Sequence, residues 1–312
     1  MKRNLFLIAI AILLFSCSEN KQSEVHTPIN DTFSTEQKTS TETVDLGSQT
    51  SQWIATDSTI ICKTEDDNAV YAILNKETLQ KTSDFGKIGH GNKEWINPFL
   101  IAANSNNIIV ADNGTRKIYN VAGGKIEDRQ KLVGTELLND PKSINYPIIG
   151  YVAMSPKSMG LKITNIEQMQ TIDSICFTSK DGNSQIYEFA WACHDSHIVI
   201  ANQHANQFIL CTLDGDKHIK NKEFFEGKAA FDENKVFYTD AVCDNNFVYL
   251  LSQKQVNMED GSGHSEIEIY DFNGKPQRKL VLDFIAFKML LDNNRMLLTS
   301  VADDCIHVAR LK

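Results

Sequence analysis

Short apolar runs, each entered through a turn rich in aspartate and asparagine, recur along the chain. After each turn come four to six aliphatic, β-branched or aromatic residues, which is the pattern of a short buried strand. The turns of five such runs begin at Asp57, Asn106, Asp195, Asp244 and Asp292. They are 49, 89, 49 and 48 residues apart, and because 89 is nearly twice the other steps we expect a degenerate copy near residues 147–154. The pattern therefore predicts six copies of one structural repeat.

Each copy continues in the same way after its apolar run. A polar gap leads to a second strand with alternating residues, as in residues 117–121, 207–211 and 266–270. A further turn, often with glycine, then precedes a last strand such as residues 279–282. No stretch of about 11 residues or more has the period of a helix. Repeats of about 40–50 residues with four short strands are typical of β-propellers, so we predict an all-β fold, a six-bladed β-propeller with four-stranded blades.

The two ends of the repeat predict how the ring closes. The sixth copy ends soon after residues 306–310 and lacks one strand, whereas residues 43–47 form a spare strand before the first copy. We therefore expect the N-terminal strand to complete the last blade, which leaves few sheet edges exposed. On this basis residues 43–312 form one propeller domain, within the size that closed all-β folds reach.

The segment between the first two copies carries a glycine-rich motif that ends in an aromatic residue and a proline. Its distinctive residues are Gly86, Gly89, Gly91, Glu94, Trp95 and Pro98. A phosphate-binding loop would need a following helix and a Lys-Ser/Thr pair, and neither is present, so we interpret the glycines as turn residues and Trp95 as an inter-blade packing residue. The motif resembles the link of six-bladed propeller lipoproteins of the Bacteroides type, often described as TolB-like or NHL-like. That resemblance implies a fold and an envelope address, but no particular chemistry.

The N-terminus predicts export and lipidation. Residues 1–4 are basic and polar, and residues 5–15 are apolar but too short for a membrane-spanning helix of about 20 residues, so residues 1–16 are expected to be a signal peptide. The sequence Leu14-Phe15-Ser16-Cys17 resembles a lipobox, which makes Cys17 the expected lipidation site; an ordinary signal peptide that contains a cysteine is the alternative. Residues 17–42 are mostly polar and are expected to be a disordered tether.

Several function classes are disfavoured by charge and cysteine usage. A formal charge of −9 argues against nucleic acid as a partner. Apart from Cys17, six cysteines lie singly in the sequence with no C-x-x-C spacing, so they are either buried small hydrophobes or members of disulfides. Ser18 follows Cys17 in place of the aspartate associated with inner-membrane retention, so we expect the anchor to lie in the outer membrane of the cell envelope. We also expect the protein to be a monomer.

Candidate binding residues gather at equivalent places in the repeat. Asp112 and Asn202 follow a strand that we expect to be the inner one of its blade, where propellers present side chains to the mouth of the central pore. The expected pore-mouth set comprises Asp112, Arg116, Asn202, His204 and Asp240. Oxygen ligands of this kind suit calcium, but the spacing of a calcium loop is absent, and His194, Asp195 and His197 would splay apart around a turn. We therefore expect no metal and no cofactor.

Two functional interpretations remain open. The first is a non-catalytic envelope propeller that binds a protein or a glycan. The second is a propeller hydrolase, lactonase or lyase with a metal at the centre of its pore. Because no catalytic motif such as G-x-S-x-G or H-E-x-x-H is present, we favour binding. Three or more Asp, Glu, Asn or His side chains converging in the channel would favour the enzyme.

Overall fold

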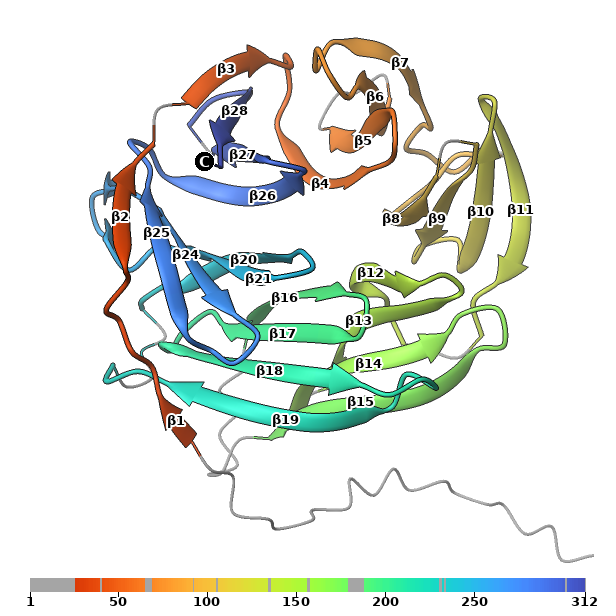
Figure 1. Cartoon of the computed structure of the whole chain (residues 1–312). Helices are drawn as coiled ribbons and strands as arrows, with labels where there is room; N and C mark the ends of the chain where they lie inside the picture. Colours follow the sequence, from red (N-terminus) through yellow and green to blue (C-terminus); the bar gives the residue numbers. More distant parts are fainter. Residues whose placement is uncertain are drawn as a thin grey trace, which may run out of the picture.

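The computed structural model describes residues 26–311 apart from residues 40, 65–68, 92, 105, 134–135, 156–157, 179–187, 230–231, 233 and 301. All regular elements in these ranges are β-strands. They form six blades of four strands each around one axis, two of which carry an added fifth strand, and one two-stranded hairpin (Figure 1). The described residues contain no helix long and apolar enough to cross a bilayer. The predicted all-β, six-bladed propeller is therefore confirmed.

The first three blades follow one another without interruption along the chain. Blade 1 consists of β4 (Thr50–Ala55), β5 (Thr59–Thr64), β6 (Tyr71–Asn75) and β7 (Lys81–Phe85). Blade 2 consists of β8 (Pro98–Ala103), β9 (Ile108–Asp112), β10 (Lys117–Ala122) and β11 (Lys125–Lys131). Blade 3 consists of β12 (Asn139–Asn145), β13 (Ile148–Ser155), β14 (Ser158–Asn165) and β15 (Gln170–Thr178). Blade 3 contains the degenerate copy, in which a Tyr146–Pro147 turn replaces the usual Asp/Asn turn.

The last three blades also recruit strands from the N-terminus. Blade 4 consists of β16 (Phe189–His194), β17 (His197–Asn202), β18 (Gln207–Leu213) and β19 (Ile219–Glu226), with β1 (His26–Pro28) as an added fifth strand. Blade 5 consists of β20 (Tyr238–Cys243), β21 (Phe247–Ser252), β24 (Glu266–Asp271) and β25 (Pro276–Val281), with β2 (Thr35–Lys38) added. Blade 6 consists of β26 (Ala286–Asp292), β27 (Arg295–Ser300), β28 (Cys305–Arg310) and β3 (Thr41–Asp45). A short hairpin, β22 (Val256–Asn257) with β23 (Ser262–Gly263), projects from blade 5.

The ring closes through the N-terminal strand, as predicted. Strand β3 pairs antiparallel with β28, and the register joins Thr41 to Ala309 and Asp45 to Cys305. The first strand of blade 1 follows only a few residues later, so the two ends of the repeat meet at one place in the ring (Figure 1).

The inner strand of each blade is the strand before the Asp/Asn turn, which corrects our expectation. Strands β4, β8, β12, β16, β20 and β26 contact one another around the ring, whereas the runs that follow the turns are the second strands. The turn joins the two: the Asp244 carboxylate, for example, accepts the N–H groups of Asn246 and Phe247 at 2.7 Å each. Both strands are apolar because both lie inside the blade stack, so composition alone does not reveal their radial order.

Alternation of strand direction gives the propeller two different faces. Connections between second and third strands lie on the same face as the links between blades, which we call the link face. The tight turns between first and second strands and between third and fourth strands lie on the opposite side, which we call the turn face. Hydrogen bonds confirm this grouping, since Asp232 of a blade link donates to the carbonyl of His204 in a second-to-third connection at 3.0 Å.

Residues 26–39, which we call the belt, lie along the outer edges of blades 4 and 5 (Figure 1). We expected residues 17–42 to be a disordered tether, and over the belt that expectation was wrong. Strand β1 pairs parallel with β19 and β2 pairs parallel with β25. A strand on the outer edge needs few apolar side chains, and Ile29 and Phe33 suffice to dock against the core between blades 4 and 5. Residues 1–25, including the predicted signal peptide and Cys17, lie outside the described residues.

The hydrophobic core is divided into clusters that lie between neighbouring blades. All three tryptophans belong to such clusters: Trp53 between blades 6 and 1, Trp95 between blades 1 and 2, and Trp191 between blades 3 and 4. The interpretation of Trp95 as an inter-blade residue is confirmed, since it is fully buried. Its ring also explains a glycine of the link, because a Cβ on Gly86 would lie 2.2 Å from the indole.

Candidate functional site

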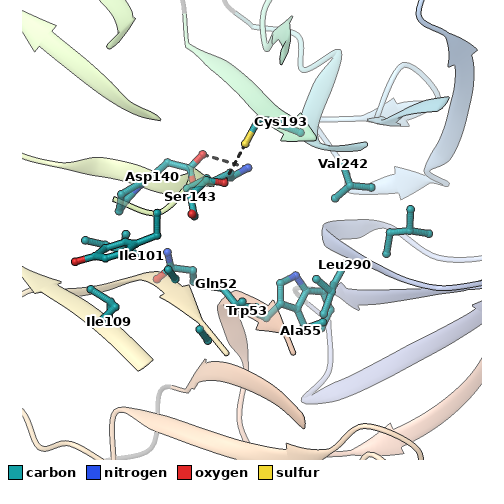
Figure 2. Close-up of a pocket in the computed structure, with 18 of the residues that line it drawn as sticks. Gln52, Trp53, Ala55, Ile101, Ile109, Asp140, Ser143, Cys193, Val242 and Leu290 are labelled. Atoms are coloured by element: carbon teal, nitrogen blue, oxygen red, sulfur yellow. Dashed lines mark hydrogen bonds and ion pairs between the residues drawn. The ribbon is translucent and has the colours of Figure 1, made fainter. Parts of the chain in front are cut away.

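A central channel runs through the propeller, and its cavity has a volume of about 800 Å³. All six inner strands contribute to its wall (Figure 2). Apolar side chains form much of the lining, among them Trp53, Ile54, Ile101, Ile109, Val242 and Leu290. Charged side chains reach it at a few places only, from Arg129, Asp140, Lys142, Asp240 and Lys288. A cavity of this size that combines an apolar wall with a few charged side chains has the character of a small-molecule site.

Polar side chains of three inner strands join blades 1, 3 and 5 to the next blade. Gln52 in β4 exchanges two hydrogen bonds of 2.8 Å with the backbone of Leu100 in β8. Lys142 in β12 donates to the carbonyl of Trp191 in β16, and Asp240 in β20 accepts the N–H of Met289 in β26 at 2.9 Å. In all three strands a register irregularity precedes the polar residue. Such bulges redirect a side chain, and here they aim it at the neighbouring blade.

Three of these charged residues meet in the half of the channel nearer the link face. The ammonium nitrogen of Lys142 lies 3.9 Å from Asp240 Oδ1, and that of Lys288 lies 3.8 Å from the same oxygen. Asp140 Oδ2 lies 3.5 Å from the Lys142 nitrogen on the other side. We call these residues the Lys142–Asp240–Lys288 group. Burial opposes the charged form of Lys142, but the carboxylates of Asp140 and Asp240 outweigh that effect and raise its pKa, so the lysine stays charged.

Nearer the turn face, the channel wall contains two cysteines on equivalent places of β16 and β20. Cys193 donates to the carbonyl of Ser143 at 3.2 Å, and Figure 2 shows its sulfur directed at that residue. Burial raises the pKa of the Cys193 thiol to about 12 and raises that of Cys243 as well. Both thiols are therefore protonated at neutral pH and are weak nucleophiles.

The acidic and histidine side chains of the described channel wall are held by other partners. Within the described ranges, no three His, Cys, Asp or Glu side chains are placed to bind one metal ion. His194 lies at the turn-face end, where its Nε2 pairs with Asn245 Oδ1 at 2.7 Å. Asp140 and Asp240 both face lysine rather than each other.

Of the five predicted pore-mouth residues, only Asp240 lines the channel. Asp112 is fully buried in the link face and accepts backbone N–H groups from the link before blade 2 and from the loop that follows β9. Arg116 donates to the carbonyl of Glu136, Asn202 accepts the N–H of His204, and the His204 ring pairs with the carbonyl of Lys235. These residues follow or lie beyond second strands, so they stand one strand away from the pore. The structure thus separates Asp112, Arg116, Asn202 and His204 from the channel and from Asp240.

Sequence analysis missed Lys142 and Lys288, although a signal was present. Lys288 interrupts an otherwise apolar run from residue 285 to residue 291, and an isolated charge inside a buried strand is unusual. With the inner strands correctly assigned, that interruption would have identified a residue facing the channel.

A second surface of interest is the link face. Seven large apolar side chains in the described part of the chain are exposed, and all seven lie on that face: Ile88, Ile96, Val133, Leu137, Met154, Met258 and Phe287. The first four belong to the links that join blades 1, 2 and 3, and Met154 ends the second strand of blade 3. Val133 is 69% exposed and Met154 57% exposed. The described turn face has no exposed apolar side chain of this size.

Comparison with known proteins gives fold neighbours. No family profile matches the sequence, and no curated protein matches it. Among solved structures, a protein of Bacteroides fragilis described as exported has a TM-score of 0.56 at 8% identity, with 89% of this chain and 99% of that chain covered. The likeness shows the fold.

Two further neighbours share the propeller architecture at similarly low identity. A gluconolactonase from Xanthomonas campestris has a TM-score of 0.52 at 9% identity over 87% of this chain and 90% of its own. The Cps50 (Swd1) β-propeller domain of Myceliophteria thermophila has a TM-score of 0.55 at 8% identity over 87% of this chain and 100% of its own. One of these neighbours is described by an enzyme activity and the other by its fold. Because a fold does not fix a function, the function has to be argued from this chain's own surfaces.

Proposed function

We propose that this chain is an envelope lipoprotein whose propeller is non-catalytic and binds a protein partner through its link face. The observation that carries the proposal is the placement of all seven exposed large apolar side chains of the described residues on one face. Single exposed apolar residues are common on protein surfaces, but their concentration on one side is typical of an interaction surface.

The kind of side chain favours a protein over a glycan. Six of the seven residues are aliphatic, namely isoleucine, valine, leucine or methionine, and only Phe287 is aromatic. Protein interfaces bury aliphatic side chains and methionine in their centres, whereas a sugar ring needs flat platforms and many hydrogen-bonding groups. Charged residues such as Lys87 and Glu136 lie among the apolar side chains, as in the polar rim of an interface.

The envelope address is supported by the predicted lipobox at Cys17 and by the apolar segment before it. The fold neighbour from Bacteroides fragilis is described as exported, which is consistent with this address. A lipid anchor would keep the propeller near the membrane, where a partner in the same envelope is concentrated.

A photo-crosslinking residue placed at 133 or 154 in the full-length chain tests the link face directly. In intact cells we expect each position to give the same discrete adduct with one protein partner. Position 216, in the exposed β18–β19 turn of the turn face, is the matched control and should give none.

Val133→Ser combined with Met154→Ser should abolish an adduct formed from position 137. Unchanged thermal stability is expected because both side chains are largely exposed. Equal adducts from the two faces would contradict the proposal.

A further inference from the structure

The channel contains a place where a carboxylate already sits between two ammonium groups. Lys142 and Lys288 approach the same oxygen of Asp240 at 3.9 and 3.8 Å. Because both distances run to one atom, the two nitrogens can be no more than about 8 Å apart, which a single oxyanion can bridge through its two oxygens.

The two lysine side chains of the group are more exposed than the aspartate side chain. The side chains of Lys142 and Lys288 are 28% and 25% exposed, whereas that of Asp240 is 6% exposed. Asp240 Oδ2 also accepts the Met289 N–H at 2.9 Å, which holds the carboxylate against the wall. A ligand that enters the channel therefore meets ammonium groups first.

Lys288 is the less constrained of the two lysines. Within the described residues it pairs with Asp240 at 3.8 Å, which is too long for a hydrogen bond. Its nitrogen also lies 5.5 Å from the centroid of the Phe287 ring. Lys142, in contrast, donates to Trp191 and pairs with Asp140. Lys288 thus keeps donor capacity for a further acceptor.

We propose that the channel binds a small organic carboxylate, which bridges Lys142 and Lys288 while its carbon skeleton lies against the apolar wall. Trp53, Ile101, Val242 and Leu290 supply that wall, and the volume of about 800 Å³ is suited to a small molecule. Asp240 acts as a resident counter-ion that keeps the two lysines close together. The group lies nearer the link face, so a free acid or an acidic residue of a link-face partner can supply the carboxylate.

Calorimetric titration of the purified full chain with hexanoate, hexanol and hexylamine tests the inference. Hexanoate should bind saturably, and hexanol and hexylamine should not. Lys288→Met should weaken hexanoate binding by about tenfold, the effect of one lost charge-assisted hydrogen bond. Asp240→Asn should strengthen it, since the competing carboxylate is gone while an oxygen remains for the Met289 N–H. Lys125→Met, an exposed lysine of the turn face, is the matched control and should change nothing.

The source of the carboxylate follows from combining the two experiments. If Lys288→Met weakens hexanoate binding and leaves the link-face adduct intact, the natural ligand is a free acid. If the same variant also abolishes the adduct, the partner supplies the carboxylate. Hexanoate that binds Lys288→Met and the unchanged chain equally, or that does not bind the unchanged chain below about 10 mM, would overturn the inference. If positions 133 and 154 gave no adduct but hexanoate still bound through Lys288, the link-face proposal would fail and the carboxylate-binding inference would remain.

Discussion

Asp112 is a fully buried carboxylate that accepts hydrogen bonds from backbone N–H groups. Its carboxylate accepts N–H groups from Asn97 at 2.7 Å, from Ile96 and Gly114 at 3.1 Å, and from Thr115 at 3.2 Å. Burial by itself would raise the pKa of Asp112, but these hydrogen bonds outweigh it and hold the pKa below its ordinary value. The residue therefore fixes the link between blades 1 and 2 to the loop of blade 2.

Asp112→Asn should lower the free energy of unfolding at pH 7 by about 2–3 kcal/mol, because the amide cannot accept all four N–H groups. A carboxyl whose folded pKa is lowered stabilises the protein above the unfolded pKa of about 3.9 and loses that contribution as the pH falls through the folded value. The difference between the two proteins should therefore shrink below about pH 4 in denaturant titrations. Asp214→Asn, in an exposed turn of the turn face, is the control. A difference independent of pH would contradict the role assigned to the charge.

At the scale of elements, the belt covers a buried polar cluster as well as a sheet edge. Glu268 lies beneath it and accepts from Lys254 at 2.7 Å and from the Tyr270 hydroxyl at 2.8 Å. Burial, with Glu268 beside it, raises the pKa of Tyr270, so the hydroxyl stays a donor. Phe33 lies edge-on to the Tyr270 ring, with the centroids 5.5 Å apart. The belt thus shields an ion pair that would be weaker in open solvent.

Phe33→Ala should lower the free energy of unfolding by about 2 kcal/mol and expose residues 26–39 to proteases, because Phe33 is one of two apolar side chains that dock the belt. Equilibrium denaturation and timed proteolysis would measure the two effects. Glu36→Ala, at an exposed position of the same strand β2, should leave both unchanged. If Phe33→Ala behaves like Glu36→Ala, the belt does not contribute to stability.

Some elements of this fold are encoded locally and others are not. The turns at Asp57, Asn106 and their equivalents mark strands because each turn is specified by its own side chains, so blade number and ring closure could be predicted. Radial order could not, since the strands on both sides of a turn are apolar. The belt escaped prediction because backbone hydrogen bonds and two apolar residues hold it. The lysine group escaped because blades far apart in the sequence bring its members together.

At the scale of the whole molecule, the belt changes how far the propeller can stand from a lipid anchor. A disordered segment up to residue 42 would allow a long reach. With the chain paired to blade 4 from His26 onward, nine residue steps separate Cys17 from the folded domain, a span of about 30 Å at most. The outer edge of blade 4 would then face the membrane closely.

Metabolic labelling with a palmitate analogue tests the anchor. The unchanged chain should be labelled and should sediment with membranes, and Cys17→Ala should lose the label because the acylated sulfur is absent. Cys305→Ala, which changes a cysteine in the propeller, is the control and should keep the label. Label retained by Cys17→Ala would contradict lipidation at this residue.

Closure of blade 6 by β3 also determines when this protein can finish folding. The pairing joins Asp45 to Cys305, which lies 260 residues later in the chain, and contacts between such distant residues form late because the intervening chain must first be ordered. A partial product that lacks β28 cannot complete the ring. If a chain of this design is exported, it can become a closed propeller only after β28 has reached the side of the membrane on which β3 already lies.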